Sequence, residues 1–239
     1  MEVRVQGEVD PGPFLSAQDI FETEFDLDRP VYVKVREDPD VRTWTAHYDN
    51  HHHLNVSRRV ATSAMARELT LHELSHMYRY EEGHASHRQS TKEALYLALA
   101  GPAADDRIAY HGLQIANHMK DIYADDLTLS VGPSGKLVSF FESSLATAVG
   151  DAQPGTDATS ITAVNAAFAL ALCERHELLD RSHRLYDLAD IAAGDAPHIP
   201  IDHYKGRFRS LVDNPTPTEY RRELVGTIKS FASDIATAD

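Results

Sequence analysis

The hydrophobic periodicity of this 239-residue chain changes once, near Arg59, and this change constrains the fold more than any other feature of the sequence. Before it, apolar and polar residues alternate in short runs, as they do in strands that bury one face. After it, apolar residues recur at helical spacing almost to the end of the chain. A small sheet followed by a set of helices is an α+β pattern, and we find no linker that would divide the chain.

The same periodicity predicts where the elements lie. We expect a short helix over 16–25 and strands over 3–5, 31–35, 41–47 and 53–57. The predicted longer helices are 60–80 (ending near Gly83), 91–100, 102–125, 136–149, 161–193 and 218–236, with a loop over 194–217. Within one domain, the chain then has a β-rich part (1–58), a motif helix with the helices that follow it (59–126) and a helical C-terminal part (127–239).

Acidic residues dominate the charge of the chain. There are 37 Asp and Glu against 23 Lys and Arg, so the net charge of −14 disfavours nucleic-acid binding. Asp exceeds Glu and Arg far exceeds Lys, a pattern typical of halophilic cytosolic proteins, although an acidic mesophilic enzyme would share it. The single cysteine, Cys173, excludes an intrachain disulfide, and no apolar run is long enough to cross a bilayer. We therefore expect a soluble, cytoplasmic protein without a membrane partner.

The strongest functional signal is the segment His72-Glu73-Leu74-Ser75-His76. Histidines at positions i and i+4 of a helix lie one turn apart on the same face, so both imidazoles can reach one cation. Glu73 is rotated by about 100° from His72, which leaves it close enough to activate a water bound to that cation. The alternative interpretation is a surface helix that carries two histidines by coincidence.

A strand, a helix with His-Glu-x-x-His and further helices occur in the same order in the zincin metallopeptidases, which this chain resembles over about 31–126. It also looks like an uncharacterised archaeal, haloarchaeal-type member of that clan. The resemblance implies a zincin-like fold, in which the motif helix lies under a small sheet whose edge strand binds extended substrate. It further implies that His72 and His76 bind one catalytic Zn²⁺ and that Glu73 is the general base.

A catalytic zinc site needs a third protein ligand and an open position for water. The metzincin pattern is excluded, because Arg79 and Glu82 stand where that pattern needs glycine and histidine. Asp105 is the first candidate, because it resembles the acidic residue that precedes Arg-Ile in some metallopeptidases. A capping box with Ser90 and a favourable position in a first helical turn are the structural alternatives for the acidic candidates. Four other candidates for the third ligand stay open, namely Asp106, Glu93, His84 and His87.

Three further groups have simpler structural interpretations. We interpret His51-His52-His53 as a solvated loop in preference to a metal-binding or cleft-lining segment. His176, Asp180 and His183 could share one helical face, but we favour a charged surface face over a second metal site. The basic and aromatic segment 204–209 is interpreted as a solvated turn in preference to a docking loop.

The sequence thus predicts a zinc-dependent hydrolase, most directly a peptidase acting on a peptide or protein substrate. His72, His76 and Asp105 are the predicted metal ligands, and Glu73 is the predicted base. An imidazole-rich ligand set favours zinc over other divalent ions. The alternative class is a non-catalytic metal-binding or interaction protein that retains a zincin scaffold. The substrate, the oxyanion-stabilising residue and the oligomeric state stay open.

Overall fold

The computed structural model describes residues 1–100, 106–151, 153 and 156–237. These residues form a four-stranded mixed sheet near the N-terminus and eleven helices, which confirms the predicted α+β class. The chain divides into two compact units. The first contains Met1–His87 and Tyr123–Lys136, and the second contains Arg88–Ile122 and Leu137–Asp239. That the chain forms a single domain stays a prediction.

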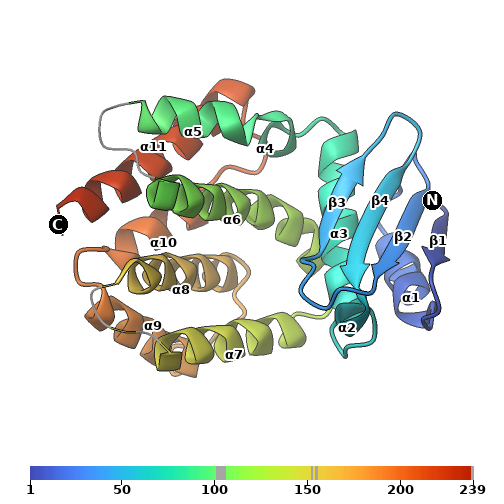
Figure 1. Ribbon diagram of the computed structural model, residues 1–239, viewed down its shortest axis with the longest axis horizontal. Coiled ribbons are helices and arrows are strands. Elements are labelled where there is room, and N and C mark those ends of the chain that lie inside the picture. Colours follow the sequence, from blue (N-terminus) through green and yellow to red (C-terminus); the bar gives the residue numbers. More distant parts are fainter. Residues whose placement is uncertain (101–105, 152, 154–155, 238–239) are drawn as a thin grey trace. The chain divides into compact units, whose positions relative to one another are not determined.

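The sheet of the first unit has the strand order β1-β2-β4-β3 (Figure 1). Strands β1, β2 and β4 are parallel, and β3 pairs antiparallel with β4 at one edge. Because parallel neighbours need a crossover, the chain passes through helix α1 (Gly12–Phe21) between β1 and β2. The strands are β1 (Val3–Gln6), β2 (Val31–Arg36), β3 (Trp44–His47) and β4 (His52–Ser57).

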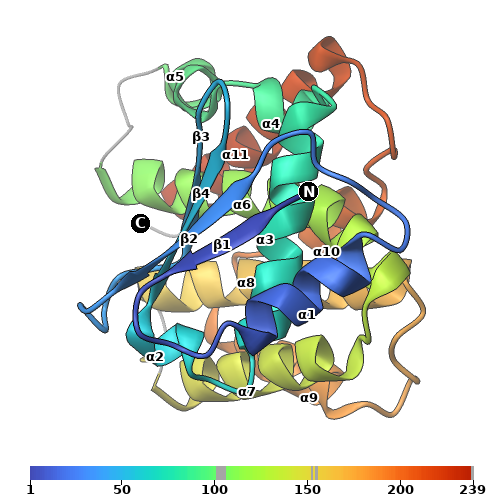
Figure 2. The same cartoon turned by 90° about the vertical axis from the view of Figure 1, so that its right-hand side faces the viewer.

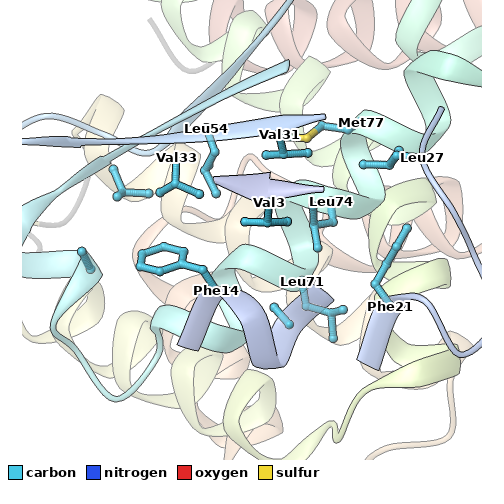
Figure 3. Close-up of a cluster of buried hydrophobic side chains, with 13 residues drawn as sticks. Val3, Phe14, Phe21, Leu27, Val31, Val33, Leu54, Leu71, Leu74 and Met77 are labelled. Atoms are coloured by element: carbon cyan, nitrogen blue, oxygen red, sulfur yellow. The ribbon is translucent and has the colours of Figure 1, made fainter. Parts of the chain in front are cut away.

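The core of the first unit lies between this sheet and the helices α1 and α3 (Ala66–Glu81) (Figures 2 and 3). Val31 and Val33 of β2 are fully buried, as the alternation in that strand predicts. The largest side chains that meet them from the helices are Phe14, Phe21, Leu71, Leu74 and Met77. This packing fixes which face of α3 is turned toward the sheet.

The predicted helix over 60–80 is interrupted in the structure. Helix α2 (Arg58–Ala61) ends after one turn, and α3 begins only at Ala66. The side chains of Thr62 and Ser63 hydrogen-bond to the backbone carbonyls of Arg58 and Val60 at 3.0 and 2.8 Å. Such local bonds compete with helix continuation, which explains the break.

Helix α3 ends where the sequence predicted. Gly83 adopts a left-handed conformation with φ 75°. Its N–H bonds to the carbonyl of Tyr80, and the N–H of His84 bonds to the carbonyl of Arg79 at 3.0 Å. This pair of bonds is the Schellman motif, which satisfies the last carbonyls and reverses the chain. The short helix α4 (Ala85–Arg88) therefore follows immediately.

The second unit is helical. Helix α8 is buried along nearly its whole length, including Cys173. No helix in the described part of the chain combines the length and the apolar character needed to span a membrane. Helix α6 begins in this unit and continues into the first. The helices after α4 are α5 (Thr91–Leu99), α6 (Asp106–Val131), α7 (Gly135–Asp151), α8 (Asp157–Arg175), α9 (Arg184–Asp195), α10 (Ile201–Arg209) and α11 (Pro217–Ala236).

Two sequence predictions in this unit are wrong. The region predicted as a loop over 194–217 contains α10, whose Tyr204 and Phe208 are buried, so 204–209 is not a solvated turn. Phe208 packs against Phe168 of α8 with ring centroids 6.0 Å apart. The helix predicted over 161–193 is instead the two helices α8 and α9.

The break between α8 and α9 has the same geometry as the end of α3, but without glycine. Glu177 has φ 54°, and the N–H groups of Glu177 and Leu178 bond to the carbonyls of Glu174 and Cys173. Because left-handed backbone strongly favours glycine, a glutamate at this position gives no helix-end signal in the sequence.

The two helix ends make a matched stability test. Gly83→Ala places a Cβ on left-handed backbone and should lower the free energy of unfolding by about 1–2 kcal/mol. Glu177→Gly removes the same strain and should leave the free energy of unfolding unchanged or raise it by up to about 1 kcal/mol. Urea denaturation of both variants and the wild type measures these changes, and equal destabilisation by both would contradict the assigned backbone conformations.

Strand β4 is tied to the end of α3 by a buried histidine. His52 Nε2 lies 2.9 Å from Glu81 Oε1, and His52 Nδ1 lies 2.9 Å from His47 Nδ1. Burial lowers the pKa of His52 below its ordinary value of 6.5, against the raising effect of Glu81. The carboxylate of Glu81 also accepts the backbone N–H groups of Asp28 and Arg29 just before β2.

This depressed pKa predicts a pH dependence of stability. Below pH 6.5 the unfolded chain binds a proton at His52 that the folded chain does not, so the free energy of unfolding should fall as the pH decreases from 6.5. In His52→Gln this contribution is absent, so its curve should be flatter over that range. Urea titrations between pH 7.5 and pH 5 measure both curves, and identical slopes would exclude His52 as the titrating group.

Candidate metal centre

The motif helix α3 turns its apolar residues to the sheet and its histidines away from that contact. Leu71, Leu74 and Met77 belong to the buried core, whereas His72 and His76 are half-buried. Glu73 is 8% exposed, so its carboxylate has little contact with bulk solvent. The i, i+4 spacing therefore places two partly accessible imidazoles on one side of a well-anchored helix.

The two imidazoles face each other through the same ring atom. His72 Nε2 and His76 Nε2 are 3.0 Å apart, and the ring planes cross at 83°. Because zinc–nitrogen bonds are about 2.0–2.1 Å long, two nitrogens can share one ion only if they lie within about 4 Å of each other. The separation of these two atoms meets that condition.

The other nitrogen of His72 is held by a buried carboxylate. His72 Nδ1 lies 2.6 Å from Oδ1 of Asp125, which is 3% exposed and belongs to α6. A carboxylate accepts this bond, so Nδ1 carries the proton, and in the neutral imidazole the electron pair that can bind a metal is at Nε2. Metal-bound histidines are commonly oriented by such a carboxylate.

The contact between α3 and the end of α6 is built from small and polar groups. Ser75 Oγ lies 2.9 Å from Thr128 Oγ1, and Arg79 Nε donates to the carbonyl of Tyr123 at 2.9 Å. A Cβ added to Gly132, just after α6, would lie 2.6 Å from Leu71 Cδ2. This close approach of the two helices holds Asp125 against His72.

Asp121 completes a candidate ligand set. Ligand atoms of His72, His76 and Asp121 all lie within 4.8 Å of one another, the only such trio found among the described residues. Asp121 stands one helical turn before Asp125 on the continuous helix α6, so both carboxylates lie on one face of it. All three candidate ligands are partly accessible to solvent.

His76 is held on its other side by the segment that follows α3. His76 Nδ1 lies 2.7 Å from His87 Nε2, and His87 Nδ1 lies 2.8 Å from Ser86 Oγ. Ser86 Oγ lies in turn 2.7 Å from His84 Nδ1. His84 and Ser86 are buried. The reversal of the backbone at Gly83 thus brings a row of hydrogen-bonded polar side chains to the Nδ1 side of His76.

The candidates for the third ligand that the structure describes lie in different places. Asp105 lies outside the described residues. Asp106 begins α6, about 28 Å of helix before Asp125. Glu93 lies in the first turn of α5, where its backbone N–H donates to the side chain of the N-cap residue Ser90 at 3.2 Å, and its carboxylate pairs with Arg221 at 3.2 Å. His87 does return to the motif, but it contacts Nδ1 of His76, and His84 is linked to His87 only through Ser86.

Sequence reasoning missed Asp121 and Asp125. Their signal is present in the sequence, since two aspartates at i and i+4 flank Ile122, Tyr123 and Ala124, all of which are fully buried. Acidic residues beside a buried helical stripe need partners, and the two histidines of the motif were available.

Among the residues that the structure describes, neither of the other two histidine groups brings three metal-ligand atoms together. His52 and His53 lie in β4, and His52 is buried, so the prediction of a solvated loop is wrong for them. His176 ends α8 and His183 caps α9, while Asp180 binds Ser182 in the turn between them. These three residues therefore do not share a helical face, because the predicted helix is broken.

The fold and the site together define an α+β protein with a candidate His/His/Asp metal site on two of its helices. The model of a family of unknown function, DUF5781, matches residues 1–233, and the chain belongs to this family. No curated protein and no solved structure matches the chain. The family match carries no link to the zincins.

A matched pair of variants tests the ligand set. Asp121→Ala removes a candidate ligand and should weaken zinc binding by more than the roughly 10- to 100-fold that loss of an outer hydrogen-bond partner costs. Asp105→Ala, the ligand predicted from the sequence, should leave the affinity unchanged. Competition with a chromophoric chelator measures both dissociation constants, and the reverse ranking would replace Asp121 by Asp105.

Proposed function

We propose that this chain binds one zinc ion through His72, His76 and Asp121 and hydrolyses an amide bond, with Glu73 as the general base. The observation that carries the proposal is the orientation of the two imidazoles. Their Nε2 atoms face each other at 3.0 Å, while each Nδ1 atom has a hydrogen-bond partner.

The donor set fits zinc in number and in kind. Two imidazoles and one carboxylate are a ligand set of catalytic zinc sites, in which the fourth position stays open. A structural zinc site would use four protein ligands, and the described residues supply three here. The partial exposure of all three side chains is consistent with access for a substrate.

Bound zinc would supply a Lewis acid that lowers the pKa of a coordinated water and polarises a carbonyl oxygen. Glu73 follows His72 on the same turn of α3 and would accept a proton from the attacking water at its carboxylate. The water oxygen then bonds to the carbonyl carbon, the C–N bond breaks, and Glu73 returns the proton to the leaving amine. Asp125 keeps His72 Nδ1 protonated throughout.

A peptide or protein is the substrate class that we propose. Strand β3 pairs with β4 on one side and lies at the edge of the sheet. An edge strand offers unpaired backbone groups that an extended peptide can join. His47 of β3 stacks on Tyr80 of α3 with ring centroids 3.9 Å apart, so this edge is anchored to the motif helix.

Glu73→Gln separates the reaction from metal binding. The amide keeps the shape of the side chain but cannot accept the proton, so hydrolysis should fall by about 10²- to 10⁴-fold. Zinc content should stay at about one ion per chain, because Glu73 is not a proposed ligand. A quenched fluorescent peptide mixture with the zinc-loaded protein measures the rate, and elemental analysis measures the zinc.

Removal of the metal provides the control. A chelator should abolish hydrolysis by the wild type, and added zinc should restore it. Full activity of Glu73→Gln would contradict the proposed base. Zinc binding without hydrolysis of any peptide by the wild type would favour the non-catalytic metal-binding alternative.

A further inference from the structure

We propose that His87, Ser86 and His84 form a hydrogen-bond relay that holds His76 in the one tautomer able to bind a cation through Nε2. These three are positioning residues, since they act through His76 and provide no ligand. The inference rests on the proposed metal site, but its hydrogen-bond pattern can be measured in the metal-free protein.

The direction of the relay is set at its buried end. The backbone N–H of Ser86 donates to His84 Nδ1 at 3.3 Å, and a backbone N–H cannot reverse its role. His84 Nδ1 therefore carries no proton. The hydroxyl of Ser86, 2.7 Å from the same nitrogen, must then donate its single proton to it.

The remaining protons follow in order. Since the Ser86 proton points to His84, Ser86 Oγ accepts from His87 Nδ1 at 2.8 Å. In the neutral form of its ring, His87 then has its electron pair at Nε2, which accepts from His76 Nδ1 at 2.7 Å. Nε2 is then the unprotonated nitrogen of His76 and can bind a cation.

This assignment gives the two motif histidines the same tautomer. Asp125 leaves His72 with its electron pair at Nε2, and the relay does the same for His76. The two Nε2 atoms lie 3.0 Å apart, so a cation bound to one is within reach of the other. The reverse direction of the relay would put a proton on His76 Nε2 and block the metal.

The local fold places the relay residues beside His76. The Schellman motif at Gly83 turns the chain directly after α3, and α4 places His87 beside His76. His84 is 7% exposed and Ser86 is fully buried, so water competes little for these hydrogen bonds. A polar chain of this kind is stable only when every member has its partner.

Ser86→Ala is the variant that tests the relay, because it removes the hydroxyl that donates to His84 and accepts from His87. The matched control is Ser160→Ala, since Ser160 is also buried and its hydroxyl lies 2.9 Å from His198 Nε2 in the second unit. Nitrogen-15 NMR of the imidazoles in the metal-free, full-length protein reports which nitrogen of His76 is protonated.

In the wild type and in Ser160→Ala we expect His76 to be protonated at Nδ1 alone. In Ser86→Ala we expect a mixture of both tautomers and a zinc dissociation constant raised by roughly 10- to 100-fold. A wild-type His76 protonated at Nε2, or an unchanged tautomer and affinity in Ser86→Ala, would overturn the relay.

The result separates the relay from the proposed reaction. If zinc affinity and tautomer both respond to Ser86→Ala while the wild type cleaves no peptide, the relay stands and the hydrolase proposal fails. If the wild type binds no zinc, the metal site fails, and a retained Nδ1–H tautomer that is lost in Ser86→Ala supports the relay alone.

Discussion

The hydrogen bond between His72 and Asp125 is the interaction on which the rest of the site depends. It joins residues 53 positions apart and fixes the proton of His72 on the ring nitrogen that points away from His76. The close packing of α3 on the end of α6 makes it possible, through Ser75 with Thr128 and Arg79 with the Tyr123 carbonyl. Asp121 is delivered by the same helix, one turn earlier.

The two histidines of the motif are oriented by hydrogen bonds from different parts of the chain. A distant carboxylate orients His72, whereas the segment immediately after α3 orients His76. In both rings Nε2 is then the nitrogen that can bind a cation, and the two Nε2 atoms face each other. Of the 37 acidic residues, the proposed chemistry uses only Glu73, Asp121 and Asp125, so most of the acidity behind the net charge of −14 lies outside the site.

The elements that could be predicted from the sequence are those determined by local periodicity and short motifs. The strands at Val31 and His53, the motif helix and its end at Gly83 were all predictable, because each has a residue pattern that acts over a few positions. The end of α8 was not predictable, because Glu177 adopts a conformation that usually requires glycine. The pair Asp121 and Asp125 is visible in the sequence beside a buried helical stripe, but its partners could not be assigned, because they depend on the packing of α6 against α3, which no local pattern specifies.

The central claim is that one divalent cation binds between the Nε2 atoms of His72 and His76. The most direct measurement is anomalous X-ray diffraction at the zinc edge from crystals of the zinc-loaded, full-length protein. We expect one strong peak per chain, within about 2.0–2.2 Å of both Nε2 atoms and of an Asp121 carboxylate oxygen. A peak elsewhere, or no peak at this position in a zinc-loaded crystal, would contradict the account.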